Sequence, residues 1–411
     1  MAGNSNLGSA KSKKNDEFYT RYADIEAEMN AYVDYNPDVF RGKTILLPCD
    51  DPEWSNFTKY FANNFTAFGI KKLISTSYAK SAGSRQLTFF EESSPVFDKK
   101  KHKTRGKLFT LTRDANGSGR IDSDDVELMG YLEGDGDFRS DEVTKLRDEA
   151  DIIITNPPFS LFREFLGWIL EGGKDFIIMG NMNAITYKEV FPLIKNNEMW
   201  LGYKSLNNDT YFTVSEEYQK WLLENKKEGS AYKIIDGIVM GRLASACWFT
   251  NVEHGKRHEK LLLDTKAHHL KYHKRLQNTL ETEYGKLEYP RYDNYDAIEV
   301  PCVDAIPSDY TGVMGVPKTF LDKYNPEQFE IIGTSQSWDK YNSKQYAKQI
   351  QVSKSGIETE VTKLNDGPAI ELETPPAGQT YYIVDGKYYI QTYARILIRN
   401  RHPQTQKPKK K

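Results

Sequence analysis

The chain of 411 residues has little of the features that define several special classes of protein. Its three cysteines, Cys49, Cys247 and Cys302, are odd in number and far apart, which excludes a disulfide framework. No run approaches 18 consecutive apolar residues, so we expect no membrane-spanning helix. The polar residues 1–17 lack the apolar core of a signal peptide, so we expect a cytoplasmic protein. Glycine (28) and proline (17) are near average use, which excludes a fibrous or low-complexity chain.

Neither sign of charge dominates, since 56 Lys and Arg face 58 Asp and Glu. This near-neutral balance argues against a protein whose whole surface coats nucleic acid. The charge is nevertheless uneven: acids outnumber bases 37 to 31 up to residue 240, and bases outnumber acids 25 to 21 beyond it. The densest basic stretch, Lys256–Arg275, holds seven Lys and Arg against two acids. Such a stretch is either a phosphate-binding surface or a solvated helix face, and both alternatives stay open.

From Lys43 to about Val252, short apolar runs alternate with amphipathic stretches. The expected strands are Thr44–Leu47, Leu73–Ser77, Asp151–Thr155, Phe176–Met179 and Cys247–Thr250. The expected helices between them are Ser55–Phe68, Leu161–Leu170 and Tyr187–Ile194. This alternation predicts an α/β domain with a parallel sheet covered on both faces. Ligands of such sheets bind beyond the carboxyl ends of the strands.

Beyond Val252 the sequence is rich in proline and tyrosine. A helix is expected over His258–Glu283, and Tyr381–Tyr389 reads as a β-hairpin that turns at Asp385-Gly386. We therefore expect a second, mixed α+β domain of about 150 residues.

The sharpest motif is Asn156-Pro157-Pro158-Phe159, directly after an expected buried strand. The two prolines fix the backbone and remove two N–H donors, so the turn is stiff and presents carbonyl oxygens. The Asn156 side chain and the Pro157 carbonyl form a pair of acceptors for one exocyclic amino group, and Phe159 offers a face for stacking. Methylation of an amino group on a planar heterocycle needs such positioning.

This motif resembles the catalytic motif of amino-directed DNA methyltransferases that use S-adenosylmethionine. Four further segments are similar to the EcoRI-type adenine-N6 methyltransferase family: Lys14–Thr20, Cys49–Phe57, Gly134–Ser140 and Gly180–Thr186. The resemblance covers about residues 14–250 and continues more loosely through Gly312–Gly333 and Tyr393–Asn400. It implies a Rossmann-like methyltransferase domain followed by a DNA-recognition domain.

The resemblance implies roles for particular residues. The cofactor residues would be Phe18, Tyr19, Thr20, Asp50, Asp51, Asp137, Phe138 and Asn156, and the catalytic residues Asn156, Pro157, Pro158 and Phe159. The segment Phe18–Thr20 would lie against the methionine tail, and Asp50 would meet the cofactor's ammonium or ribose hydroxyls. Asp137 would accept from the adenine amino group, with Phe138 against its ring. The chain departs from the usual pattern at Pro48–Pro52, where a glycine-rich turn is common.

The resemblance also implies a division of the chain and a set of partners. Residues 1–13 would be a flexible start, 14–253 the catalytic domain, 254–400 the target-recognition domain and 401–411 a basic tail. DNA phosphates would be bound by Lys256, Arg257, Lys271 and Arg275. The protein would be a monomer from a bacterium or phage, acting on duplex DNA. A restriction endonuclease for the same site would be a functional partner without a stable complex.

Two weaker patterns suggest metals. Asp114–Asp125 has the spacing of a calcium loop, but an expected strand precedes it and position 12 is Asp, so a polar turn is favoured. Five of the seven histidines lie between His254 and His273, yet no Cys or carboxylate completes a zinc spacing. We therefore expect no metal.

Two other function classes remain open from the sequence. One is an amino-directed methyltransferase acting on ribosomal RNA or a protein glutamine, where the same motif occurs. The other is a non-catalytic DNA-binding protein that kept the fold.

Overall fold

The computed structural model describes residues 19–48, 50–51, 55–79, 94–102, 104–204, 206, 209–339 and 341–404. The chain forms two compact units. Unit 1 comprises Met1–Ala184 and Met199–Gly255, and unit 2 comprises Ile185–Glu198 and Lys256–Lys411.

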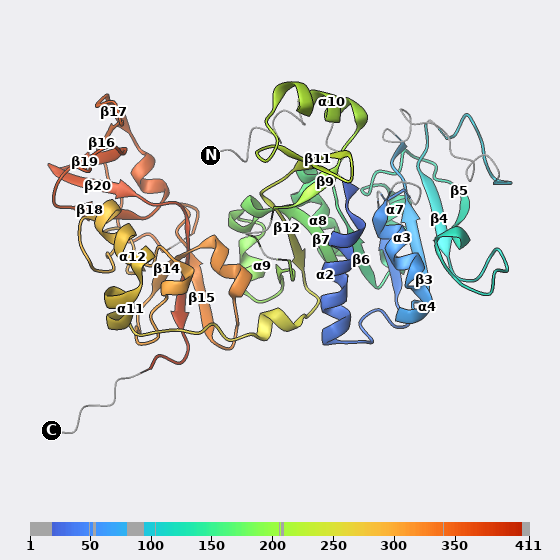
Figure 1. The fold of residues 1–411 in the computed structure, drawn as a ribbon, viewed down its shortest axis with the longest axis horizontal. Helices are drawn as coiled ribbons and strands as arrows, with labels where there is room; N and C mark the ends of the chain where they lie inside the picture. Colours follow the sequence, from blue (N-terminus) through green and yellow to red (C-terminus); the bar gives the residue numbers. More distant parts are fainter. Residues whose placement is uncertain are drawn as a thin grey trace. The chain divides into compact units, whose positions relative to one another are not determined.

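A large mixed sheet forms the centre of unit 1 (Figure 1). In the described residues it has eight strands, in the order β5-β4-β3-β2-β6-β7-β12-β8. Their bounds are β2 (Thr44–Leu47), β3 (Lys72–Thr76), β4 (Lys107–Leu111), β5 (Glu127–Tyr131), β6 (Ile152–Thr155), β7 (Asp175–Asn181), β8 (Trp200–Leu201) and β12 (Ala246–Thr250). The central β3, β2, β6 and β7 are parallel, and the flanking strands are antiparallel to their neighbours. All five expected strands exist, and four of them form the expected parallel arrangement. The fifth, β12, is antiparallel to β7, and the strands added on both sides of the sheet are antiparallel to their neighbours.

Burial explains why the central strands read as continuous apolar runs. On one face, Ile45 and Ile152 belong to a core cluster shared with helices α2 to α4. Side chains alternate along a strand, so Leu46 and Ile153, which are also fully buried, point to the other face. The helices are α2 (Tyr22–Tyr35), α3 (Asn56–Asn63), α4 (Phe65–Phe68), α7 (Asp141–Glu149) and α8 (Phe162–Glu171). Helices α7 and α8 contact β2 and β7. Both faces of the sheet are therefore covered.

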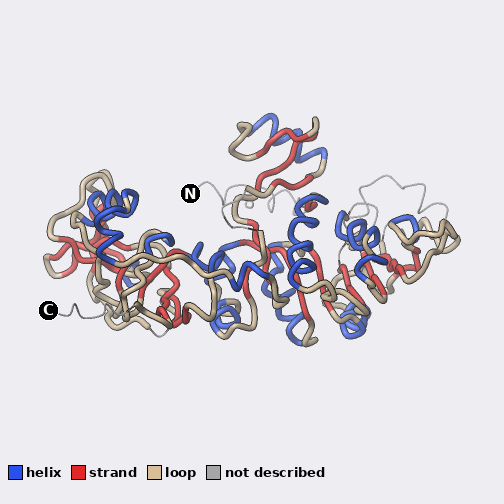
Figure 2. Tube along the Cα trace, turned by 60° about the horizontal axis from the view of Figure 1, so that its bottom comes forward, coloured by secondary structure: helices blue, strands red, loops and turns tan. Residues whose placement is uncertain are grey.

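A second, smaller sheet of unit 1 was not expected from the sequence. Its order is β1-β9-β11-β10, with β1 (Tyr19–Thr20), β9 (Tyr211–Thr213), β10 (Tyr232–Ile235) and β11 (Ile238–Arg242). Helix α10 (Glu216–Asn225) packs on it, and the two together lie beside the central sheet (Figure 2). Asp236 and Gly237, both at positive φ, turn the chain between β10 and β11.

In its described residues, unit 2 contains two sheets. The first has the order β13-β14-β21-β15 and the second β17-β16-β19-β20-β18. The bounds are β13 (Ile298–Glu299), β14 (Met314–Pro317), β15 (Phe329–Thr334), β16 (Gln349–Val352), β17 (Glu358–Val361), β18 (Ala369–Leu372), β19 (Tyr381–Val384), β20 (Lys387–Gln391) and β21 (Arg395–Asn400). Val384 pairs with Lys387, and Asp385 and Gly386 have positive φ, which confirms the expected hairpin.

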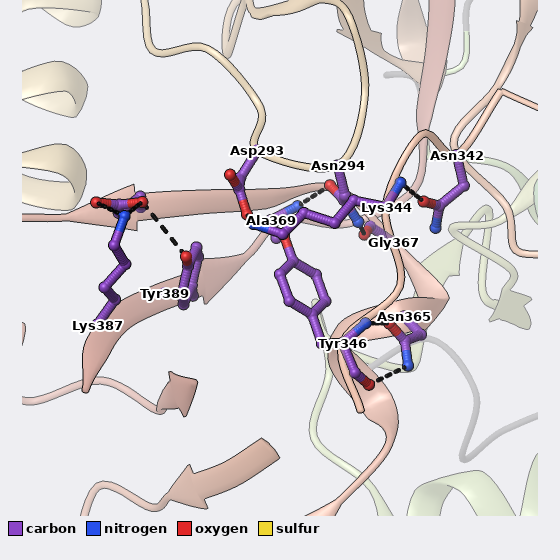
Figure 3. Close-up of polar contacts among 11 residues, drawn as sticks. Asp293, Asn294, Asn342, Lys344, Tyr346, Asn365, Gly367, Ala369, Lys387 and Tyr389 are labelled. Carbon is purple, nitrogen blue, oxygen red and sulfur yellow. Dashed lines mark hydrogen bonds and ion pairs between the residues drawn. The ribbon is translucent and has the colours of Figure 1, made fainter. Parts of the chain in front are cut away.

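A buried polar contact joins the loop before β13 to the second sheet of unit 2 (Figure 3). The Asn294 side chain is fully buried, donates to the Gly367 carbonyl at 2.9 Å and accepts from the Ala369 N–H at 2.8 Å. Next to it, Lys344 donates to the Asp293 carboxylate. An asparagine whose donor and acceptor ends are both engaged fixes a loop against a strand, so this cluster is structural.

The single helix expected over His258–Glu283 is wrong. The chain instead forms α11 (Lys266–Tyr272), α12 (Lys274–Thr279) and a π-helical turn at Leu280–Tyr284. His273 divides them because its backbone is not helical and its Nδ1 accepts from the Leu276 N–H at 3.0 Å, which caps α12. Similarly, the helix expected at Tyr187–Ile194 is α9 (Phe191–Lys195), which contacts β15 in unit 2.

Among the described residues, none of the helices combines the length and the apolar character that crossing a membrane requires.

Candidate active site

Two polar turns lie together at the carboxyl ends of neighbouring parallel strands. Asp50 and Asp51 follow β2, and Asn156 follows β6, which pairs directly with β2. The neighbour of β2 on its other side is β3, so the strand order reverses at β2. In open α/β sheets, ligands bind at such a reversal, beyond the carboxyl ends of the strands.

Asp50 is the buried carboxylate of this edge. One carboxylate oxygen accepts from the Ser55 hydroxyl at 2.8 Å and the other from the Thr155 hydroxyl at 2.5 Å. Burial raises the pKa of Asp50 to about 7, although the bonds from Thr155 and Ser55 lower it, and the negative charge of Asp51 raises it further. Such a carboxyl would bind a cationic ligand group, which would favour its ionised form.

Asp51 forms a buried ion pair with Lys107, at 3.0 Å between Nζ and the carboxylate. The Lys107 side chain is only 2% exposed. Its backbone is fixed to the end of β3, because the Ser77 N–H donates to the Lys107 carbonyl at 3.1 Å and the Lys107 N–H donates to the Ser77 hydroxyl at 3.1 Å. Lys107 therefore belongs to this site, although no sequence motif points to it.

The Asn156–Phe159 turn is held rigidly. Pro157 is buried, while Asn156 and Phe159 are half-buried. The Asn156 side-chain nitrogen donates to the Thr20 hydroxyl at 3.3 Å, so Thr20 on β1 reaches the motif across 136 positions of sequence. Phe159 packs against the large core cluster. The Asn156 side chain is thus held by a residue of the smaller sheet, to which β1 belongs.

The segment Gly134–Arg139 lies against the end of β3. Gly136 has a φ of 88°, and a Cβ on it would lie 2.2 Å from the Ser77 carbonyl oxygen, so only glycine fits this approach. The Asp137 carboxylate accepts from the Arg139 guanidinium at 2.9 and 2.7 Å.

Phe138, which follows in that segment, is 2% exposed. Its ring packs edge-on against Phe165 and Trp168 of α8, with centroids 5.0 and 5.6 Å away. Stacking of Phe138 on a cofactor ring would require this side chain to leave the core, whereas the Asp137 side chain is paired with Arg139. Phe18 and Cys49 lie outside the described residues.

The calcium-like loop is held by its own backbone. The Asp125 carboxylate accepts from the N–H groups of Ala115, Asn116 and Asp122, and Asp114 accepts from those of Ser118 and Gly119. These bonds describe a polar turn. In the part of the chain that the structure describes, no cluster of three His, Cys, Asp or Glu side chains is suited to hold a metal ion.

The basic segment divides into two kinds of residue. Lys256 donates to Asp322 at 2.7 Å, and Arg257 is 4% exposed and bonded to Asn197. A phosphate contact by Arg257 would require its guanidinium to leave this buried position. Lys271 on α11 and Arg275 on α12 are exposed. The phosphate-binding alternative therefore rests on these last two.

The model of the family described as "Adenine-specific methyltransferase EcoRI" matches residues 6–401, so the chain belongs to this family. The family expected from the sequence motifs is thereby confirmed.

Three curated relatives are similar over most of the chain. Type II methyltransferase M.EcoRI of Escherichia coli is 40% identical over 332 residues, which is 80% of this chain and 89% of the relative. Type II methyltransferase M.MpnI of Mycoplasma pneumoniae is 33% identical over 327 residues, 79% of this chain and 83% of the relative. Type II methyltransferase M.MgeORF184P of Mycoplasma genitalium is 33% identical over 323 residues, which is 79% of this chain and 84% of the relative. No solved structure matches the chain with significant similarity.

Proposed function

We propose that this protein is a site-specific DNA adenine methyltransferase, which transfers a methyl group from S-adenosylmethionine to the N6 amino group of an adenine in duplex DNA. Membership of the adenine-specific family and the type II relatives support the reaction and a role in restriction–modification. The observation that carries the proposal in this structure is the direct link between Asp50 and the catalytic turn, made by Thr155.

The donor set beside β2 fits the cofactor. When bound, S-adenosylmethionine supplies an electrophilic methyl group on a sulfonium. Asp50, whose raised pKa reflects burial, would take the cofactor's ammonium. Tyr19 would line the methionine tail, and Asp137 would accept from the cofactor's adenine. Asp51 would line the cofactor site, with its carboxylate held in place by the ion pair with Lys107.

Asn156 and Pro157 would hold the target amino group by two acceptors, the Asn156 side-chain oxygen and the Pro157 carbonyl. The lone pair of the N6 nitrogen is delocalised into the adenine ring. Two acceptors placed on its N–H groups favour pyramidal geometry and direct the lone pair at the methyl group. The attack is then direct, without a covalent bond to the enzyme. Positioning of this kind supplies a large share of a rate enhancement.

An adenine inside duplex DNA is inaccessible to such a site, so the base must rotate out of the stack. The half-buried ring of Phe159 and the stiff Pro157-Pro158 turn support a stacking platform for the flipped base. Phe159 also packs against the core, which fixes its ring.

For the chain as a whole, we assign catalysis to residues 14–253 and target recognition to 254–400. The exposed cations Lys271 and Arg275 support a phosphate contact in the second region. The boundary between the compact units at Gly255 and Lys256 supports this proposed division, and Ile185–Glu198 is assigned to unit 2. The protein would act as a cytoplasmic monomer. Any cognate restriction endonuclease would act on the same DNA recognition sequence.

Transfer of labelled methyl groups to three substrates tests this proposal. Purified protein is incubated with labelled S-adenosylmethionine and duplex DNA, ribosomal RNA or a mixture of proteins. We expect label in duplex DNA alone, and N6-methyladenine after digestion to nucleosides. Label in RNA or protein would establish the rival methyltransferase class, and cofactor binding without transfer would establish the non-catalytic alternative.

A further inference from the structure

The side-chain amide of Asn156 raises a question of orientation. The two ends of an asparagine amide have nearly the same shape, but one accepts hydrogen bonds and the other donates them. Only the oxygen end can accept from the amino group of a substrate. An amide turned by 180° would present its own NH₂ group to the target and could not hold it. Something in the site must therefore select the productive orientation.

Thr20 has the contacts to make this selection. Its hydroxyl lies 3.3 Å from the Asn156 side-chain nitrogen and 3.2 Å from the Met179 sulfur. A thioether sulfur only accepts hydrogen bonds, so the single hydroxyl proton of Thr20 is directed at Met179. The Thr20 oxygen is then an acceptor toward Asn156. Only the nitrogen end of the amide can satisfy it.

Thr20 itself is held in place from several sides. It is 3% exposed, and its strand β1 pairs with β9, with Thr20 opposite Phe212. Its carbonyl accepts from the Asn56 side chain at 2.8 Å, which ties β1 to the start of α3. Met179 on β7 is 1% exposed and belongs to the core cluster. The position of the Thr20 hydroxyl beside the Asn156 amide is thus fixed by the surrounding structure.

We propose that Thr20 is a positioning residue that acts through Asn156: it orients the amide so that the side-chain oxygen faces the target amino group. This inference rests on the proposed function and deepens it. It gives Thr20 a different task from the contact with the methionine tail that the family resemblance implies. A residue that acts on the amide changes the rate of transfer, whereas a residue that contacts the cofactor changes cofactor affinity.

The test compares Thr20→Val, which keeps the shape but loses the hydroxyl, with Thr20→Ser, which keeps the hydroxyl. For each variant we measure the single-turnover rate of methyl transfer to duplex DNA and the Kd for S-adenosylhomocysteine. We expect the rate of Thr20→Val to fall about tenfold, the upper end of what one net hydrogen bond supplies. The Kd should stay within about twofold, and Thr20→Ser should recover most of the rate.

A second background makes the test specific. Asn156→Asp replaces the amide by a carboxylate with two equivalent oxygens, which has no orientation to select. In that background, Thr20→Val should lower the remaining rate much less than in the wild type, so the two changes should be strongly non-additive. Thr20→Ala serves as a second hydroxyl-free variant if Thr20→Val proves unstable, with the thermal midpoint as the check on folding.

Three outcomes would overturn the inference. These are an unchanged rate in both hydroxyl-free variants, a rise in Kd that accounts for the whole loss, and equal losses in the wild-type and Asn156→Asp backgrounds. Failure of the proposed function is a separate result, because the wild-type protein would then not methylate adenine at all.

Discussion

Asp50 offers a quantitative test of cofactor binding, because its pKa lies within the working range of pH. Burial raises this pKa from an ordinary value near 3.8 to about 7, with the hydroxyls of Thr155 and Ser55 acting in the opposite direction. As the pH falls below about 7, an increasing share of the ligand-free protein therefore carries a proton on this carboxyl. A ligand ammonium that pairs with Asp50 has to displace it. Affinity should fall as the pH is lowered.

The magnitude follows from this pKa. For one displaced proton and a pKa of about 7, the Kd at pH 6 should be about tenfold higher than at pH 8, since one pKa unit is about 1.4 kcal/mol. The free energy of unfolding of the ligand-free protein should fall as the pH rises, whereas cofactor affinity increases. The folded protein binds this proton more tightly than the unfolded chain, so the contribution of Asp50 falls as pH rises from about 4 to 7, by roughly 4 kcal/mol.

Calorimetric titration with S-adenosylhomocysteine between pH 6 and 8 measures the effect, because the ligand keeps its ammonium charge in this range. Asp50→Asn should bind more weakly at pH 8 and show a flat profile. Asp34→Asn, a change at an exposed position on α2, is the matched control and should keep the wild-type slope. A flat wild-type profile, or an unchanged slope in Asp50→Asn, would refute the assignment of Asp50 to the ammonium.

Three further predictions concern Lys107, the exposed cations of α11 and α12, and Phe159. Lys107→Met removes the cation of a buried ion pair and should destabilise the protein by about 3 kcal/mol or more in chemical denaturation, whereas Lys107→Arg should retain most of the stability; equal stability of the two would show that the pair contributes nothing. Changing Lys271 and Arg275 to Gln should lower the salt-dependence slope of DNA binding by about 1 per residue, and the same change at the exposed Lys354 should not alter it; an unchanged slope would mean that these cations lie on a solvated face. Phe159→Ala should lower methyl transfer by about ten- to a hundredfold, because one stacked ring is worth about 1–3 kcal/mol, and the loss should shrink when the target adenine lies opposite a mismatch. Phe159→Tyr should retain a good part of the activity, and equal rates for the Ala and Tyr variants would show that the ring only packs against the core.

Features that arise from local patterns were predictable from the sequence. The apolar run Thr44–Leu47 is a buried strand with the bounds expected, because a strand buried on both faces needs continuous apolar residues. The Asp385-Gly386 turn was predicted because two successive residues at positive φ favour this pair. The same signal at Asp236-Gly237 also marks a hairpin, but the stretches beside it are of mixed polarity and do not alternate as clearly as a strand does.

Features that arise from contacts between distant segments were not predictable. Lys107 meets Asp51 across 56 positions, and nothing in the local sequence around Lys107 distinguishes it from a solvated lysine. The reverse error arose at Arg257, where a dense basic stretch suggested exposure and the structure buries the side chain. The contact of Thr20 with Asn156 depends on β1 joining a sheet whose other strands lie beyond residue 210. Charge patterns alone carry no information on such partners.

Asn156 is proposed above as the catalytic acceptor of an adenine-N6 DNA methyltransferase. Single-molecule sequencing of DNA from a host that expresses either the wild-type protein or Asn156→Ala tests this claim most directly, because it reports both the modified base and its sequence context. We predict N6-methyladenine at one recurring sequence with the wild-type protein. The Asn156→Ala variant should methylate at least about a hundredfold more slowly, the loss typical of one positioned catalytic hydrogen bond, and leave these sites almost unmodified. Equal modification by the variant, modification of another base, or none by the wild-type protein would contradict the claim.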